Sequence, residues 1–457
     1  MLPRHQILSG ILLPICGFVL LVVPACASSA DASPATVPSV GADLNAIHQR
    51  VKEAEIRLGD RAGIPEEPDQ YEKIPKDGRW LSTVEAKGAF AMANPRLERM
   101  KWWNIGIDPT NLAHELREPA AVISGCAAAY RAGLTDADRS LSIARDAADF
   151  LIWAQAQAGT GVFPFPSTRN VTGKKPFAAA ESSYAKAGRE GRMDQMMHNG
   201  WTIDDAGTGG LQFDNGEAGV AMLELYETTR EQKYLESARK AADWAISRPL
   251  AENWNYNSFS VRLLAKAYDV THERRFLEAA AHKAIAGVIP GQLDKGPRAG
   301  RWLDAHNAKP NYHYIIMNSL AQLALVMPED DPARPEVMRS LQLGLLARNR
   351  DFSDLGSPNR NKAMETLVLV NRGFAEQRDF LRDSKSEEAL DALGKLVSEL
   401  YRSGVAPLGP KEWGAFLSFI VWKSIPTAGL PTRNDTGRLH SPIGTNSVGK
   451  LTSGSKS

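Results

Sequence analysis

A segment near the middle of the chain carries a high density of acidic side chains. Four carboxylates lie within fourteen consecutive residues, with glycines among them. Glycine lets the backbone turn sharply and approach a ligand closely, and two carboxylates about 5–9 Å apart can divide the acid and base roles of glycoside cleavage. The pattern therefore predicts catalytic carboxylates among Asp204, Asp205, Asp214 and Glu217.

Each of these carboxylates also has a structural interpretation. Asp204 and Asp205 have the residue type that turns a loop. Asp214, with Glu217 three residues later, matches the capping box, in which an N-cap residue and a glutamate at position N3 satisfy the free N–H groups at the start of a helix. The point at which the following helix begins decides between capping and catalysis.

Aromatic and polar side chains accompany the carboxylates and recur in two later loops. Aromatic rings offer flat apolar faces that suit the C–H faces of sugar rings, and amides and imidazoles hydrogen-bond hydroxyl groups. The loops therefore predict substrate-binding residues for a glycan: Phe165, His198, Trp201 and Gln212 in the first loop, Trp254 and Tyr256 in the second, and Arg301, Trp302, His313 and Tyr314 in the third.

The third loop also suits a different reaction. A histidine or tyrosine can remove a proton adjacent to a uronate carboxylate, while an arginine pairs with that carboxylate. The candidates for this base are His306, Tyr312, Tyr314 and, from the first loop, His198. The candidates for the arginine are Arg192, Arg298 and Arg301. Histidines in such loops are more often structural than catalytic, so hydrolysis and elimination both remain hypotheses.

Composition argues against several other classes. The formal net charge is +1, and no block of lysine or arginine forms a phosphate-binding surface, so no nucleic-acid partner is expected. The acidic segment lacks the ligand order of an EF-hand, and no His-Glu-x-x-His motif is present. Neither a metal nor a cofactor is therefore expected. Cys126 is the one cysteine outside the first thirty residues, and we interpret it as a small buried apolar side chain.

Helical periodicity runs through most of the chain, and strand-like alternation does not appear. The clearest unit, residues 219–244, has an apolar helix, a short polar turn and an amphipathic helix. The same order returns forty-two residues later, so that Leu235 corresponds to Leu277. Weaker copies precede and follow these two units, which indicates a chain of repeated helical hairpins.

A helical hairpin exposes an apolar face that it cannot bury alone, so neighbouring hairpins must stack. A closed ring buries every such face without the capping repeats of an open stack. The sequence therefore predicts an all-α fold, an (α/α) toroid of about six helical hairpins, over residues 46–428. Each of the three loops precedes the first helix of its repeat, so all three are expected on one rim of the ring.

The two ends of the chain differ from this body. Residues 1–30 have a short positive start, an apolar run and a small-residue stretch, which is the order of a secretory signal peptide. The apolar run is short for a membrane span, which needs about 20 residues, so no stable span is expected after signal removal. Residues 31–45 suit a flexible leader and residues 429–457 a disordered tail. We expect a periplasmic or secreted protein, with lipidation at Cys26, and hence a lipoprotein, as the alternative.

The hairpin repeats and the acidic, glycine-rich segment Trp201–Glu217 resemble the six-hairpin glycosidase-like superfamily of (α/α)6 toroids over about residues 110–425. This superfamily includes glycoside hydrolases, unsaturated-uronyl hydrolases, polysaccharide lyases and sugar epimerases. The resemblance implies a carbohydrate-active enzyme with a glycan substrate. Three hypotheses follow: a glycoside hydrolase that uses paired carboxylates, a lyase or epimerase acting on uronates with a tyrosine or histidine base, and a non-catalytic glycan-binding protein of the cell envelope.

Overall fold

The computed structural model describes residues 71–98, 117–133, 137–166, 185–199, 201–205 and 209–424. By its internal contacts the chain divides into Met1–Thr36 and Val37–Ser457, and every described residue belongs to the second unit. The predicted signal peptide with Cys26, the predicted leader and the predicted tail lie outside the described residues. Within those residues, no helix combines the length and the apolar character needed to cross a membrane.

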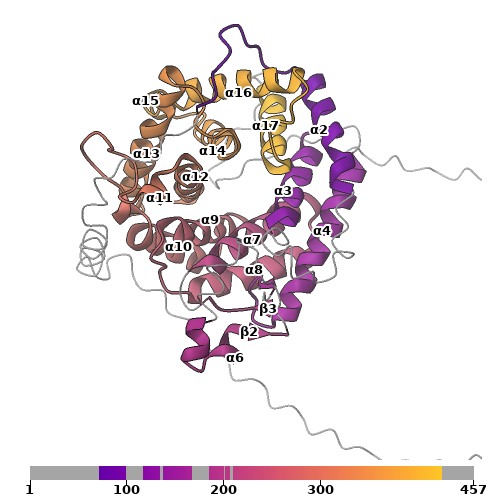
Figure 1. Ribbon diagram of the computed structural model, residues 1–457, viewed down its shortest axis with the longest axis vertical. Coiled ribbons are helices and arrows are strands. Elements are labelled where there is room, and N and C mark those ends of the chain that lie inside the picture. The colour runs from indigo at the N-terminus through magenta and orange to yellow at the C-terminus, as the bar shows by residue number, and fades with distance from the viewer. Residues whose placement is uncertain are drawn as a thin grey trace, which may run out of the picture. The chain divides into compact units, whose positions relative to one another are not determined.

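Six helices form a closed inner ring (Figure 1). Each helix packs against the next along the chain, and the last packs against the first. The ring confirms the predicted (α/α) toroid. Its members are α3 (Arg117–Arg131), α7 (Gly210–Thr229), α9 (Trp254–Thr271), α12 (Pro310–Val326), α14 (Arg360–Gly373) and α17 (Pro410–Lys423).

A second layer of helices lies outside this ring. Five of them follow an inner helix along the chain and pack back against it: α4 (Ala137–Ala158), α8 (Gln232–Ser247), α10 (Arg274–Gly287), α13 (Arg334–Asp354) and α16 (Ser386–Arg402). The sixth outer helix is α2 (Thr83–Glu98), which packs on α17. Segments from opposite ends of the described chain therefore complete the sixth hairpin, as Figure 1 shows.

The forty-two-residue repeat appears in the structure as a repeated helix ending. Thr229 closes α7 and Thr271 closes α9, and each hydroxyl donates to the carbonyl four residues earlier, at 3.0 and 2.7 Å respectively. The next residues, Arg230 and His272, have left-handed φ angles of 62° and 58°. Such a residue stops a helix because the chain leaves it at a sharp angle. Two copies of the same short turn therefore set the same hairpin geometry.

Short elements fill the connections. Three two-residue strands form an antiparallel sheet in the order β1-β3-β2, although the sequence indicated no strand. All three come from the long connection between α4 and α7, where strand pairing satisfies backbone groups that lie outside a helix. The short elements are β1 (Phe165–Pro166), α6 (Met193–Met196), β2 (Met197–His198), β3 (Trp201–Thr202), the 3-10 helix η4 (Ile289–Gly291), α11 (Ala305–Ala308) and α15 (Arg378–Asp383).

Two glycines allow the ring to close between α3 and α17. A Cβ atom at Gly125 would collide with the carbonyl oxygen of Pro410, and one at Gly414 would lie 2.7 Å from the carbonyl oxygen of Gly125. Both obstacles are backbone atoms, which cannot rotate away as a side-chain end can. The seam between the first and last inner helices therefore depends on the absence of two side chains.

We expect Gly125→Ala to lower the free energy of unfolding by about 1–3 kcal/mol or more, because the added methyl group must push the two helices apart. Gly88→Ala on α2 is the matched control, since a Cβ there meets nothing within 4 Å. Glycine costs an exposed helix up to about 1 kcal/mol relative to alanine, so the control should be neutral or stabilising. Denaturant unfolding of both variants measures the difference. Equal stabilities would contradict a glycine-dependent seam.

Candidate functional site

All six inner helices begin at the same end of the ring, because each outer helix returns the chain before the next inner helix starts. We call this end the N-terminal rim and define it by the first two turns of α3, α7, α9 and α12, together with α11. The side chains described next come from these turns. They bring together several residues that the sequence singled out.

The centre of the rim is an arginine–carboxylate pair. Arg117, the first residue of α3, donates from Nε to Asp214 Oδ1 at 2.7 Å and from Nη2 to Oδ2 at 3.1 Å. The same guanidinium lies 3.7 Å above the ring of Phe213, which stacks on Phe259 at 4.1 Å. A two-point contact of this kind fixes the orientation of the carboxylate. Asp214 is therefore an oriented carboxylate beside an aromatic surface.

Tyr256, on the first turn of α9, adds a hydroxyl group to this pair. Burial raises the pKa of Tyr256, the charges of Tyr312, Asp214 and Asp205 raise it further, and Arg117 lowers it. The phenol is consequently protonated at neutral pH and available as a hydrogen-bond donor to a ligand. The Tyr256 hydroxyl group therefore lies close enough to Asp214, Asp205 and Arg117 to interact with their charges.

The missing side chain of Gly209 leaves room for the Tyr256 ring. It is the residue before α7, with a φ of 89° that side-chain-bearing residues rarely adopt. A Cβ atom at this point would lie 2.8 Å from Cδ2 of Tyr256. The glycine thus serves both the backbone turn into α7 and the close approach of the tyrosine.

The third loop contributes an imidazole and a phenol. His306 on α11 stacks on Tyr312 of α12, with ring centroids 4.1 Å apart and planes 28° apart. Burial lowers the pKa of His306, Asp304 raises it and Lys309 lowers it. The imidazole is therefore mostly neutral at pH 7 and able to accept a proton. Asp304 fixes α11 by accepting the backbone N–H of Asn307 at 2.8 Å.

The other predicted carboxylates have structural partners. Asp204 is held by Arg248, whose Nη2 lies 3.1 Å from both carboxylate oxygens. Asp205 is buried and accepts the backbone N–H of Leu211 at 2.9 Å, in the first turn of α7. The capping interpretation of Asp214 and Glu217 is wrong, because α7 begins at Gly210 and both residues lie inside it.

Glu217 belongs to a set of buried charges on the ring axis, which we call the central ion cluster. Three carboxylates and three cations form it: Glu217, Glu365, Glu412, Arg262, Lys362 and Lys411. Lys411 Nζ lies 2.5 Å from Glu217 and 2.8 Å from Glu365. Burial alone would raise the pKa of Glu217, but Lys411, Lys362 and Arg262 outweigh burial and lower it to about 2. Glu217 therefore stays ionised and is unsuited to donating a proton.

Several predicted substrate-binding residues lie in the core and not on a free surface. Trp201 meets Trp153 edge to face and Trp254 packs over Gly291, because an indole ring buries more apolar area there than a loop surface allows. The polar ends of the remaining core residues bond the protein itself: Gln212 bonds Ser260, Trp302 donates to the Val288 carbonyl, His313 bonds the Gly344 carbonyl, and Tyr314 donates to Asn349. These side chains shape the ring and present no open face to a glycan.

The last three predicted positions lie apart from the rim centre. His198 is exposed and its Nδ1 lies 3.0 Å from the Gln157 carbonyl. Arg301 pairs with Asp351 at 3.3 Å. Phe165 is in β1, and its side chain is outside the described part of the structure. Of the sequence-predicted residues, the rim thus brings together Asp205, Asp214, Tyr256, His306 and Tyr312.

Arg117 was missed by sequence reasoning. It begins the first inner helix, at the same phase of the hairpin repeat as the acidic segment before α7. Its position at the start of an inner helix, which the hairpin repeat predicts, could have identified it as a rim residue. Its aspartate partner lies 97 residues away in the sequence, so no local motif links the two.

Similar proteins were found among solved structures only. No known family matches the sequence, and no curated protein matches it. Among solved structures, a polysaccharide lyase is similar with a TM-score of 0.47 and 14% identity, covering 75% of this chain and 99% of that one. A family 88 glycosyl hydrolase from Bacteroides vulgatus has a TM-score of 0.45 and 12% identity, covering 75% and 99%. A sugar epimerase from a ruminal bacterium has a TM-score of 0.41 and 10% identity, covering 83% and 98%. The fold assignment rests on the closed ring described above.

Proposed function

We propose that this protein is a carbohydrate-active enzyme whose catalytic site is the N-terminal rim. The observation that carries the proposal is the convergence of Arg117, Asp214, Tyr256 and the His306–Tyr312 stack. These side chains come from four different hairpins, and each reaches the rim from the first turns of its helix or from the loop before it. A purely structural ring has no need to gather an oriented carboxylate, a protonated phenol and a neutral imidazole at one end.

Glycoside hydrolysis is the reaction we place first. One carboxyl group must protonate the glycosidic oxygen while a carboxylate accepts a proton from water or attacks the sugar carbon. Asp214, held in one orientation by Arg117, suits the second role. Asp205 is the second carboxyl group near Tyr256 and, once protonated, is our candidate for the proton donor. Phe213 supplies an apolar face beside them for a sugar ring.

Uronate elimination or epimerisation is the second candidate, and the His306–Tyr312 stack favours it. A neutral imidazole can remove the proton adjacent to a uronate carboxylate, and burial keeps His306 neutral. A tyrosine next to it can return or relay that proton. Arg117 is the rim cation that would meet the negative charge of the substrate.

A turnover screen of the mature chain on neutral and uronate polysaccharides tests the proposal. Reducing ends and ultraviolet absorbance are read in parallel, because elimination creates a conjugated double bond and hydrolysis does not. Reducing ends without absorbance support hydrolysis, and absorbance that rises with reducing ends supports elimination. A broad panel that gives neither signal, with direct assays for epimerisation also negative, would leave a glycan-binding protein and overturn the enzymatic proposal.

A further inference from the structure

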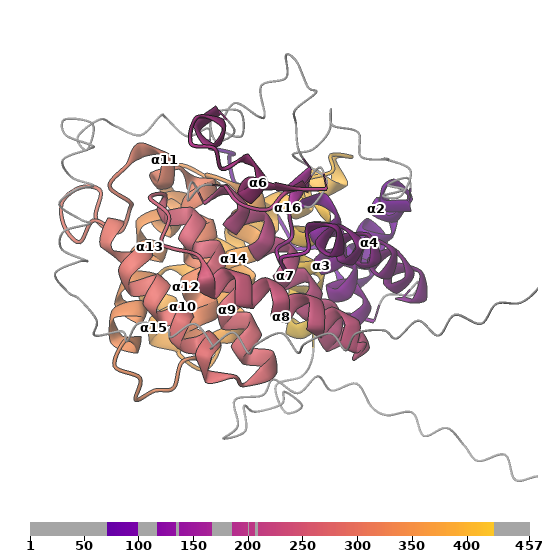
Figure 2. The same cartoon turned by 90° about the horizontal axis from the view of Figure 1, so that it is seen from below.

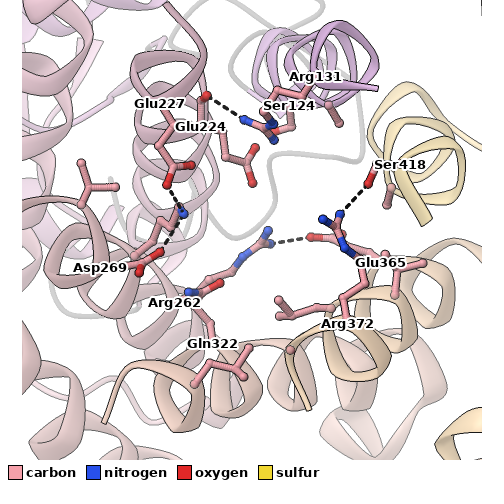
Figure 3. Close-up of a pocket in the computed structure, with 18 of the residues that line it drawn as sticks. Ser124, Arg131, Glu224, Glu227, Arg262, Asp269, Gln322, Glu365, Arg372 and Ser418 are labelled. Carbon is pink, nitrogen blue, oxygen red and sulfur yellow. Dashed lines mark hydrogen bonds and ion pairs between the residues drawn. The ribbon is translucent and has the colours of Figure 1, made fainter. Parts of the chain in front are cut away.

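A cavity of about 890 Å³ opens within the ring at the end opposite the N-terminal rim (Figure 3). We call it the axial cavity. Residues from all six inner helices line it, and most come from the last two or three turns of their helix. Arg262, Glu365 and Lys411 of the central ion cluster also face it, so this cluster separates the cavity from the rim. Its volume falls in the range of ligand pockets, about 300–1,000 Å³.

Most of the charged groups in the axial cavity neutralise one another. Lys266 lies 2.8 Å from Glu227 and 2.9 Å from Asp269. Arg262 lies 2.7 Å from Glu365. Figure 3 shows the Arg262–Glu365 pair on the cavity wall. These groups need no ligand to balance their charge.

Two arginines on the wall are not neutralised in this way. Arg372 donates to the Ser418 hydroxyl at 2.8 Å. Arg131 donates to the Glu224 carbonyl at 3.1 Å and to the Thr228 hydroxyl at 2.9 Å. Within the described residues, neither guanidinium lies in ion-pair contact with a carboxylate. Burial, together with the nearby charge of Arg131, lowers the pKa of Arg372 to about 10.

Helix capping explains part of this arrangement. Both arginines lie in the last turn of a helix, where a cation compensates the negative end of the helix dipole. Compensation of the helix dipole does not require two guanidinium groups close enough to repel each other. A bound anion between Arg131 and Arg372 would remove the repulsion.

Two acceptor groups on the same wall lack donors. Asn318 is only 3% exposed and its Oδ1 has no hydrogen-bond partner. The Oε2 of Glu224 is also buried without a partner. A buried acceptor without a donor costs about 1–3 kcal/mol, so such groups in a cavity indicate a ligand that supplies O–H or N–H donors. Figure 3 shows the Glu224 carboxylate facing the same space as both guanidinium groups.

We propose that the axial cavity is a second binding site, which takes a small polyhydroxylated carboxylate. The ligand carboxylate lies between Arg131 and Arg372, and its hydroxyl groups donate to Asn318 and Glu224. Ser124 and Gln322 offer further polar contacts on the wall. The inference does not depend on the rim chemistry, because it uses none of the rim residues.

Calorimetric titration of the full chain with three probes tests the proposal. D-gluconate has both parts of the expected ligand, sorbitol has the hydroxyl groups without the charge, and acetate has the charge without the hydroxyl groups. We expect gluconate to bind at least about tenfold more tightly than either partial probe, since charged hydrogen bonds each contribute that much. Binding of acetate or of sorbitol as tight as that of gluconate, or no binding of gluconate, would overturn the proposal.

Two variants locate the bound ligand. Arg372→Gln should weaken gluconate binding at least about tenfold, while leaving the melting temperature of the free protein unchanged or higher, because an unneutralised buried charge is removed. Asn318→Ala should weaken gluconate binding and leave acetate binding unchanged, which keeps the test decisive if the arginine variant folds poorly. Arg274→Gln, on an exposed helical ion pair, is the control. Unchanged gluconate affinity in both cavity variants would contradict the assignment.

Discussion

Asp214→Asn is expected to lower glycan turnover at least about a hundredfold, which is the lower end of what a catalytic proton-transfer group contributes. Asparagine keeps the shape of the side chain but can neither accept a proton from water nor form a covalent bond to the sugar. Arg117 would lose its charged partner, yet it is 39% exposed and water can solvate it. Binding of the glycan should therefore persist while turnover is lost.

The measurement is the initial rate on whichever polysaccharide the screen identifies, with affinity measured separately on the inactive variant. Asp243→Asn is the matched control, because Asp243 also pairs with an arginine, Arg275, but on an outer helix. The control should keep the turnover of the unmodified protein. A fully active Asp214→Asn variant would remove Asp214 from the mechanism and move attention to His306 and Tyr312.

Lys411→Met is expected to have the largest effect on stability, lowering the free energy of unfolding by about 3–5 kcal/mol. Lys411 lies between Glu217 and Glu365, and both carboxylates are buried. Without the lysine, these two carboxylates would keep most of their desolvation cost and lose the cation that lies between them. Removing one partner of a buried cluster costs more than the cluster itself contributes, because the remaining charges keep their desolvation penalty.

The pH dependence gives this prediction a second measurement. The pKa of Glu217 is lowered to about 2 from its usual 4.5, so its stabilising contribution is present above about pH 4.5 and is lost as pH falls toward 2. In the variant, loss of the lysine raises this pKa, and protonation relieves the repulsion. The stability difference between the two proteins should therefore shrink between pH 7 and pH 4.

Lys233→Met is the control for the lysine variant. Lys233 pairs with Asp149 at 2.6 Å, but both side chains are nearly half exposed, and exposed pairs contribute about 0–1 kcal/mol. Chemical denaturation at pH 7 and pH 4 compares the three proteins. A Lys411→Met variant as stable as this control at pH 7 would mean that the cluster is hydrated, contrary to its burial.

The fold was predictable because each helical hairpin repeats the same spacing of apolar residues. Apolar spacing and the repeated turn at Thr229 and Thr271 specify each hairpin locally, and the need to bury every apolar face implies the ring. The sixth outer helix was not predictable in this way. Helix α2 has a weak amphipathic pattern, and its partner α17 lies at the other end of the chain.

The candidate site was only partly predictable, because helix phase decides which side chains reach the rim. Tyr312 is half-buried at the rim, whereas His313 and Tyr314, the next two residues, point into the core. All three are ring-bearing polar side chains at one point of the sequence, so neither residue class nor loop position separates them. Asp204 and Asp205 precede the inner helix α7 as predicted, but Asp214 and Glu217 lie inside it, and the Arg117–Asp214 pair joins two helices far apart in sequence. Such pairs follow from the closed ring and not from any local motif.

The sixth hairpin also has a consequence for the order of folding. Trp80, just before α2, packs on Phe416 and Phe419 of α17 at 5.3 and 5.7 Å, across more than three hundred residues. Hairpins can form one after another as the chain is synthesised, but this junction cannot form until the last inner helix is available. Contacts between such distant segments slow folding, and an incomplete arc leaves the apolar edges of α3 and α14 open to other chains. A chain that stops before α17 would therefore lose its protection against aggregation and not simply one hairpin in six.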